Sequence, residues 1–201
     1  MKNIAQAKGR IVVISGPSGS GKTTLRESIL KDASIRQLFV KSVSFTTRSK
    51  RTGEREGRDY FYITESEFQR KLKAGKILEW TRYLGYYYAT SRDFVAGKLK
   101  LGKNILFCLD LKGAQKIKRL FPLDSVTIFI KPPSIAELKK RIEQRCKKAC
   151  AVNTKKRLEL AKKELLAAPG FDYLVINKDF NLAVKKLKEI IFKEINVTKG
   201  E

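Results

Sequence analysis

The stretch GPSGSGKT, from Gly16 to Thr23, limits how this 201-residue chain can fold more than any other feature of its sequence. Before it, RIVVIS is a short run of mainly β-branched residues and predicts a buried strand. After it, KTTLRESILKDA places apolar residues at helical spacing. A G-x-x-x-x-G-K-[S/T] pattern between a strand and a helix predicts a loop that binds phosphate, and the alternative is a Gly/Ser turn that binds nothing.

Each residue type in this loop has a physical reason. Glycines let successive backbone N–H groups point into one concavity, and the N-terminus of the next helix adds the positive end of its dipole. We expect Lys22 to reach the β- and γ-phosphates of a nucleoside triphosphate, and Thr23 to place its hydroxyl on Mg²⁺. The residues assigned to the triphosphate are Gly16, Pro17, Ser18, Gly19, Ser20, Gly21, Lys22 and Thr23.

Strand and helix patterns continue to alternate along the chain. The later pairs are NILFCLD with LKGAQKIKRLF, SVTIFI with IAELKKRIEQR, and DYLVIN with NLAVKKLKEIIFKEI. Such alternation predicts an α/β fold of three layers, with helices on both faces of a parallel sheet. We expect one domain over residues 9–192, with its core in 9–40 and 104–192, and a C-terminal tail over 193–201.

Two segments interrupt this alternation. Between about residues 41 and 91 the pattern changes to the aromatic runs YFYI, ILEWTRY and GYYYAT, with the helix-like ESEFQRKLKAG among them. We predict a small, mostly β lobe inserted in the α/β body. The second interruption, CKKACAVNT, is polar and basic and has no Pro or Gly to fix a turn, so we predict a mobile lid over about residues 145–157.

The formal net charge of +24 raises the hypothesis of a nucleic-acid partner. Much of the lysine is spread over expected helix faces, as in TKKRLELAKKEL, and is not gathered in one tract. We therefore expect no dedicated nucleic-acid partner, although this hypothesis stays open. A basic surface would also attract small anionic substrates.

Residue types that are absent or rare exclude several kinds of chemistry. The chain has no histidine, which removes Ser-His-Asp and Cys-His catalysis. Its three cysteines, Cys108, Cys146 and Cys150, predict reduced thiols, and too few ligands surround them for a closed zinc site. No apolar run approaches about 18 residues, and the first residues lack a signal-peptide pattern. We expect a cytoplasmic protein that does not contact a membrane.

The phosphate-binding loop does not by itself identify the phosphate acceptor. A GTPase would carry an N-K-x-D motif, whereas NKDF places Asp179 one position too early. A small-molecule kinase instead needs a second anion pocket with Arg or Tyr donors. The arginine-rich stretch SFTTRSKRTGEREGRDYFY, from Ser44 to Tyr62, could supply such donors.

Six motifs, in order and spacing, resemble the guanylate kinase family over about Arg10 to Phe192: SFTTRSKR, EGRDYFY, ILEW, YYYATSR, LDLKGA and DYLVIN. The resemblance implies Mg²⁺-dependent phosphorylation of GMP, and of dGMP, to the diphosphate by ATP. It implies that the inserted lobe binds GMP, with the phosphate held by Arg48, Arg51, Tyr60 and Tyr88. It also implies that Ser44, Glu79 and Thr90 read the guanine base.

Glu79 carries the argument for guanine. The base offers hydrogen-bond donors at N1 and at its exocyclic amine, and one carboxylate can accept both. Adenine has a lone pair at N1 and would leave a buried carboxylate unpaired, which costs on the order of 1 to 3 kcal/mol. The alternative is a surface glutamate followed by a buried Trp80.

The remaining candidates lie near the predicted lid and at the end of a strand. Asp110 ends NILFCLD, where a carboxylate can hold Mg²⁺-bound water or orient the acceptor; the alternative is a cap for the next helix. The resemblance implies that Arg141, Arg145 and Arg157 close over ATP and the transferring phosphoryl group, and places Asn177 near the adenine. The alternative for these arginines is a solvated helix face.

Some features depart from the family pattern or leave the function open. Cys108 stands where family members usually carry an acid. Lys50, Arg55 and Arg58 are expected to be solvated. Two alternative functions stay open: a guanylate kinase-like domain that binds proteins with weak or no activity, and a P-loop kinase for another nucleoside monophosphate. The sequence does not determine the oligomeric state.

Overall fold

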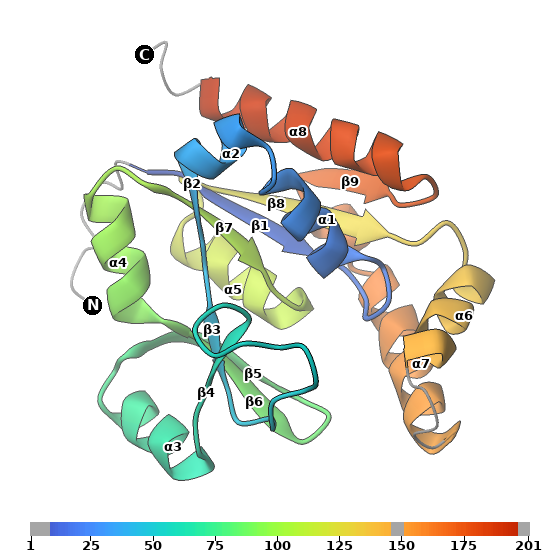
Figure 1. Ribbon diagram of the computed structural model, residues 1–201, viewed down its shortest axis with the longest axis horizontal. Coiled ribbons are helices and arrows are strands. Elements are labelled where there is room, and N and C mark those ends of the chain that lie inside the picture. Colours follow the sequence, from blue (N-terminus) through green and yellow to red (C-terminus); the bar gives the residue numbers. More distant parts are fainter. Residues whose placement is uncertain (1–8, 146–150, 197–201) are drawn as a thin grey trace.

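The computed structural model describes residues 9–145 and 151–196, and its centre is a parallel sheet of five strands (Figure 1). The strand order is β2-β7-β1-β8-β9, and every neighbouring pair is parallel. The strands are β1 (Ile11–Ser15), β2 (Phe39–Lys41), β7 (Asn104–Cys108), β8 (Ser125–Lys131) and β9 (Tyr173–Ile176). Because the strands are parallel, their carboxyl ends lie at one edge of the sheet, where ligands bind in such folds.

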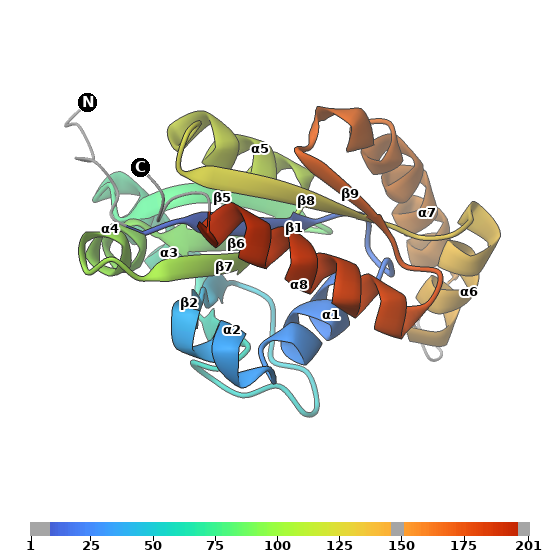
Figure 2. The ribbon, with the colours of Figure 1, turned by 90° about the horizontal axis from the view of Figure 1, so that it is seen from above.

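Helices cover both faces of this sheet (Figure 2). Successive residues of β1 point to opposite faces, so that Val12 and Ile14 belong to one hydrophobic cluster and Ile11 and Val13 to another. The first cluster includes α1 (Lys22–Ile29), α2 (Ala33–Leu38) and α8 (Phe180–Asn196); the second includes α4 (Arg92–Lys100) and α5 (Leu111–Leu120). The predicted three-layer α/β fold is confirmed.

The inserted lobe contains a separate four-stranded sheet in the order β4-β3-β6-β5. Its strands are β3 (Ser44–Thr46), β4 (Tyr60–Tyr62), β5 (Ile77–Tyr83) and β6 (Tyr86–Ser91). The sheet is mixed, since β3 pairs in parallel with β4 and antiparallel with β6. Helix α3 (Glu65–Lys73) packs on it through Phe68, whose ring stacks on Tyr87 with centroids 4.2 Å apart. The mostly β insert predicted from the aromatic runs is therefore present.

Two helices stand beside the phosphate loop, α6 (Ile135–Arg145) and α7 (Ala151–Leu165). They pack on each other through a buried cluster of Leu138, Ile142 and Ala161. Residues 151–157, which were expected in the lid, belong to helix α7. The rest of that expected interruption, residues 146–150 with Cys146 and Cys150, lies outside the described residues.

The last helix extends beyond residue 192, where the domain was expected to end, and follows the helical pattern NLAVKKLKEIIFKEI. Helix α8 runs to Asn196, so that residues 193–196, expected in a C-terminal tail, are helical. The reason is spacing, because Leu187, Ile191 and Ile195 recur every four residues and all are buried against the sheet. Within the described ranges, none of the helices is long and apolar enough to cross a membrane.

Candidate active site

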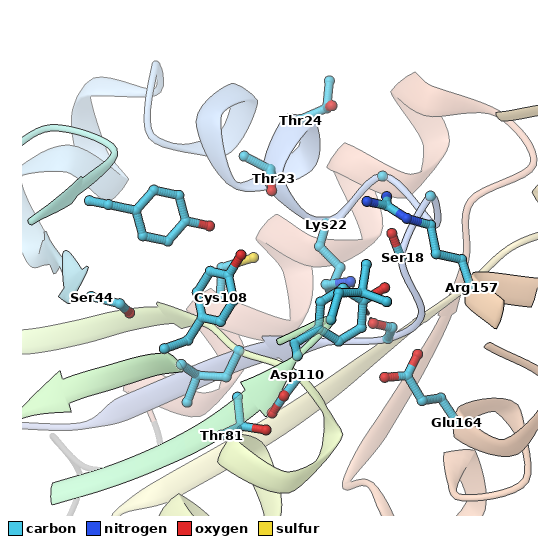
Figure 3. A pocket seen from close by; sticks show the side chains of 18 of the residues that line it. Ser18, Lys22, Thr23, Thr24, Ser44, Thr81, Cys108, Asp110, Arg157 and Glu164 are labelled. Atoms are coloured by element: carbon cyan, nitrogen blue, oxygen red, sulfur yellow. Dashed lines mark hydrogen bonds between the residues drawn. The ribbon is translucent and has the colours of Figure 1, made fainter. Parts of the chain in front are cut away.

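A cavity of about 760 Å³ opens at the carboxyl edge of the main sheet, between the phosphate loop, the inserted lobe and α7 (Figure 3). It brings together most of the residues expected from the sequence. Those that line it are Gly16, Ser18, Gly19, Gly21, Lys22, Thr23, Ser44, Arg48, Arg51, Tyr60, Glu79, Tyr88, Asp110, Arg141, Arg157 and Asn177. One continuous space therefore joins the two sets of predicted binding residues.

The remaining candidates lie next to this cavity or outside the described side chains. Pro17 and Ser20 belong to the loop itself, and Ser20 is buried. Thr90 is fully buried behind Glu79, to which it donates a hydrogen bond. Arg145 is the last residue of α6, and its side chain falls outside the described part of the chain.

The phosphate loop has a backbone that only glycine adopts easily. Gly16 has φ 137°, and a Cβ built there would lie 2.3 Å from the carbonyl oxygen of Ile130 in β8. Gly21 has φ 95°, and a Cβ there would lie 2.3 Å from Nδ2 of Asn177. The Asn177 amide donates to the carbonyl of Ser20 at 2.8 Å. Asn177 therefore braces the loop, while also lining the cavity where adenine contact was expected.

Helix α1 begins at the phosphate loop and points its N-terminus at the cavity. Its N-cap residue is Gly21, with no side-chain cap, so the first N–H groups are not covered by a capping side chain. Lys22 folds back over the loop, and its ammonium donates to the carbonyls of Gly16 and, at 2.9 Å, of Pro17. Thr23 is exposed in the first turn and lines the cavity. These groups form a site for a polyanion.

Arg48 is the most buried arginine of the inserted lobe, with a relative exposure of 7%. Nη2 donates to both oxygens of Glu54, at 2.7 and 2.9 Å, and Nε donates to the Tyr88 hydroxyl at 3.3 Å. The guanidinium also lies 5.5 Å from the centre of the Tyr60 ring. These contacts fix its direction before any ligand binds.

Glu54 is a functional candidate that the sequence analysis did not identify. It also accepts from the Arg51 backbone N–H at 2.9 Å and from the Tyr62 hydroxyl at 2.7 Å. Burial acts to raise the pKa of the Glu54 carboxyl, but the hydrogen bond from Arg48 and the others outweigh it, and the pKa is lowered. A charged Glu54 therefore organises the arginine-rich loop, although its spacing from Arg48 gave no sequence signal.

The other cations of this loop fall into two groups. Arg51 is exposed and lines the cavity. Lys50, Arg55 and Arg58 are exposed, as expected, and are not among the residues that line it. Only part of the positive charge in this stretch therefore faces the cavity.

Glu79 is buried, with a relative exposure of 5%, while the neighbouring Trp80 is 45% exposed. This is the reverse of the alternative in which Glu79 is on the surface and Trp80 in the core. Burial raises the pKa of Glu79 to about 7; the hydrogen bond from Thr90 opposes the shift, and the charge of Asp110 adds to it. A buried carboxyl that faces a cavity is suited to reading hydrogen-bond donors on a ligand.

Asp110 caps a helix and also lines the cavity. Its carboxylate caps α5 by accepting the Gly113 backbone N–H at 2.8 Å, and the residue also lines the cavity. Cys108, two residues earlier, lines the same cavity as a free thiol. Both residues lie at the carboxyl end of β7, at the edge of the sheet where the cavity opens.

Arginines from α6 and α7 complete the cavity. Arg141 donates from Nε to Glu137 at 2.9 Å and from Nη2 to the Asn177 carbonyl at 3.4 Å. Arg157 lines the cavity from α7, together with Glu164, which the sequence analysis did not select. No local sequence pattern marked Glu164, because its burial depends on how α7 packs in the fold.

A phosphate loop that faces a second, arginine-lined pocket defines a P-loop enzyme that transfers a phosphoryl group to a small anionic acceptor. The family model for guanylate kinase matches residues 8–194. The chain is 42% identical to a guanylate kinase from Mycoplasma genitalium (93% of this chain, 77% of that protein) and 41% identical to one from Thermotoga maritima (93% and 88%). A crystal structure of guanylate kinase from Anaplasma phagocytophilum matches with a TM-score of 0.76 and 31% identity, over 92% of this chain and 86% of that one. The chain belongs to the guanylate kinase family.

The raised pKa of Glu79 predicts how the stability of the folded protein depends on pH. The folded carboxyl holds its proton up to about pH 7 and the unfolded one only to about 4.5, so stability falls as pH rises through that window. We expect Glu79→Gln to raise the free energy of unfolding by about 2 kcal/mol more at about pH 8.5 than at about pH 5. Urea unfolding at both pH values measures the difference. Glu143→Gln, on an exposed residue, is the control, and an equal effect of Glu79→Gln at both pH values would contradict the account.

Proposed function

We propose that this protein transfers the γ-phosphoryl group of ATP to GMP, and to dGMP, giving ADP and the guanosine diphosphate. The observation that carries the proposal is the single cavity with the phosphate loop on one side and buried Glu79 and Arg48 on the other. Membership of the guanylate kinase family supports it. ATP fits the side of the phosphate loop, and GMP fits the side of the inserted lobe.

The GMP phosphate is assigned to Arg48, Arg51, Tyr60 and Tyr88. Guanidinium forks and phenol hydroxyls donate well to a dianion. Because Glu54 and Tyr88 already fix Arg48, little ordering cost remains when the phosphate arrives. Burial raises the pKa of the Tyr60 phenol, so this hydroxyl keeps its proton and stays a donor.

The guanine base is assigned to Glu79, with Ser44 and Thr90 beside it. Ionised Glu79 accepts hydrogen bonds from N1 and from the exocyclic amine of guanine. These two bonds replace the hydrogen bonds to water that the carboxylate loses when it is buried. Thr90 holds the carboxylate by donating to Oε1. Adenine has only one donor on that edge, so a kinase for AMP is the less favoured alternative.

Phosphoryl transfer needs no covalent intermediate with the protein, because positioning and charge stabilisation supply the catalysis. Lys22 and the backbone N–H groups of the loop are assigned to the β- and γ-phosphates. Arg141 and Arg157 are assigned to stabilising the charge that develops on the transferring phosphoryl group. The same role for Arg145 stays a prediction. Asp110 is assigned to orienting the acceptor.

The residues present also fit Mg²⁺ bound together with the triphosphate. The hydroxyl of Thr23 and the carboxylate of Asp110 are oxygen ligands of the kind that Mg²⁺ prefers, Asp110 acting through water. Across the described side chains, no group of three or more His, Cys, Asp or Glu forms a separate metal site. When bound, the ion neutralises charge on the phosphates.

The intact phosphate loop opposes the alternative of a protein-binding domain without activity. Location in the cytoplasm and the absence of a nucleic-acid partner stay predictions.

The choice of acceptor tests the proposal most simply. With Mg-ATP, we expect ADP formation with GMP and dGMP, and rates lower by at least about 100-fold with AMP, CMP and UMP. A coupled assay of ADP release measures this. Activity on AMP without activity on GMP would refute the role of Glu79, and inactivity with every acceptor would favour a protein-binding domain.

The phosphate contact of Arg48 has its own test. Arg48→Ala should raise KM for GMP by about 10- to 100-fold, because charge-assisted hydrogen bonds to a phosphate are lost. Arg48→Lys should recover only part of this, since an ammonium lacks the fork. Arg55→Ala, in the same loop but exposed and away from the cavity, should behave as wild type. Equal KM values for Arg48→Ala and Arg55→Ala would exclude Arg48 from the GMP site.

A further inference from the structure

Glu164 is a buried carboxyl that the proposed reaction has not used. It lies on α7, is 7% exposed and lines the cavity. Its Oε2 is buried and has no hydrogen-bond partner in the part of the chain that the structure describes. A buried acceptor without a donor costs free energy, so a group that stays in this state needs a reason.

Arg157 lies seven residues earlier on the same helix. Seven residues are close to two helical turns, so the two side chains share a face of α7. In Figure 3 the guanidinium of Arg157 lies beside Ser18 of the phosphate loop, and the carboxyl of Glu164 lies lower on the same side of the cavity. Nε of Arg157 is likewise buried without a hydrogen-bond partner among the described residues. A buried donor and a buried acceptor therefore face one cavity from one helix, each unsatisfied.

Arg141, on helix α6, shows how a carboxylate can hold an arginine of this region. Arg141 has its Nε held by the carboxylate of Glu137, on the same helix, at 2.9 Å. Because this contact holds the Nε side of the guanidinium, Nη2 points to another group and donates to the Asn177 carbonyl. Among the described residues Nε of Arg157 has no hydrogen-bond partner, and Glu164 is a buried acid on the same helix that lines the same cavity.

Burial and two nearby charges, Lys22 and Asp110, set the pKa of Glu164. Burial raises the pKa of Glu164 to about 7, the charge of Lys22 opposes the shift, and Asp110 adds to it. An arginine brought against this carboxyl would favour its ionised form. Ligand phosphates in the cavity would draw the Arg157 guanidinium inward, along the side where Glu164 lies.

We propose that Glu164 is a positioning residue for phosphoryl transfer: when nucleotide fills the cavity, its carboxylate accepts the Nε–H of Arg157 and directs the Nη groups at the transferring phosphoryl group. This inference rests on the proposed role of Arg157. The guanidinium is planar and its donors are fixed relative to one another, so holding the Nε edge sets the direction of the other edge. Glu164 itself does not touch the substrate.

The test is a double-mutant cycle on kcat with saturating ATP and GMP. Glu164→Gln keeps the shape and removes the charge; we expect kcat to fall by about tenfold or more, with KM for GMP within about twofold of wild type. Arg157→Ala should lower kcat further. In the double variant kcat should match that of Arg157→Ala alone within about twofold, because Glu164 acts only through Arg157.

Controls separate this role from a structural one. Glu159→Gln, on an exposed residue of α7, should leave kcat unchanged. Glu164→Gln should melt at least as high as wild type at pH 8, because it removes a buried ionisable group. Glu164→Met, of similar length and without hydrogen-bonding groups, should show the same coupling to Arg157 and serves if the Gln variant fails to fold.

The outcomes distinguish this inference from the proposed function. Wild-type kcat in Glu164→Gln, with a slow Arg157→Ala, overturns the inference alone. The inference is also overturned if the double variant lowers kcat by the product of the two single effects, since independent residues contribute additive free energies. Wild-type kcat in Arg157→Ala refutes the catalytic role assigned to Arg157 and the inference with it.

Discussion

The close packing of the phosphate loop against the end of the main sheet is the constraint on which the rest of the site depends. Gly16 passes so near the Ile130 carbonyl of β8 that no Cβ fits, and the Asn177 amide after β9 holds the Ser20 carbonyl. Strand β8 and the residue after β9, which lie on the same side of β1 in the sheet, thus hold the loop in place. The same edge carries Cys108 and Asp110 after β7. A parallel sheet places these distant segments together because all its strands end on one side.

Acidic residues organise the cations of the cavity. Glu54 holds Arg48 and Glu137 holds Arg141, each at a short distance, so both guanidinium groups have fixed directions. Two further carboxyls, Glu79 and Glu164, are buried and have a pKa of about 7. The formal charge of +24 is therefore a poor guide to this site. What matters there is which few cations are buried and which acid orients each of them.

Local signals explain what the sequence could predict. The run RIVVIS and the glycine loop identified β1, the phosphate loop and α1, since apolar runs and glycine spacing are local properties. Glu79 was found because flanking motifs resembled a known family. Helices α2 and α4 were not predicted: α2 has only six residues, and α4 has few buried residues, Val95 and Leu99, to mark its inner face. Glu54 and Glu164 owe their importance to tertiary contacts, which no local pattern displays.

The central claim is that one cavity binds the acceptor and the donor nucleotide end to end. Calorimetric titration with adenosine and guanosine joined by a chain of five phosphates tests it most directly, because such a molecule fits only if both sites are continuous. The account predicts one analogue bound per chain, and no binding of either GMP or ATP once it is bound. A protein saturated with the analogue that still binds GMP would contradict the account.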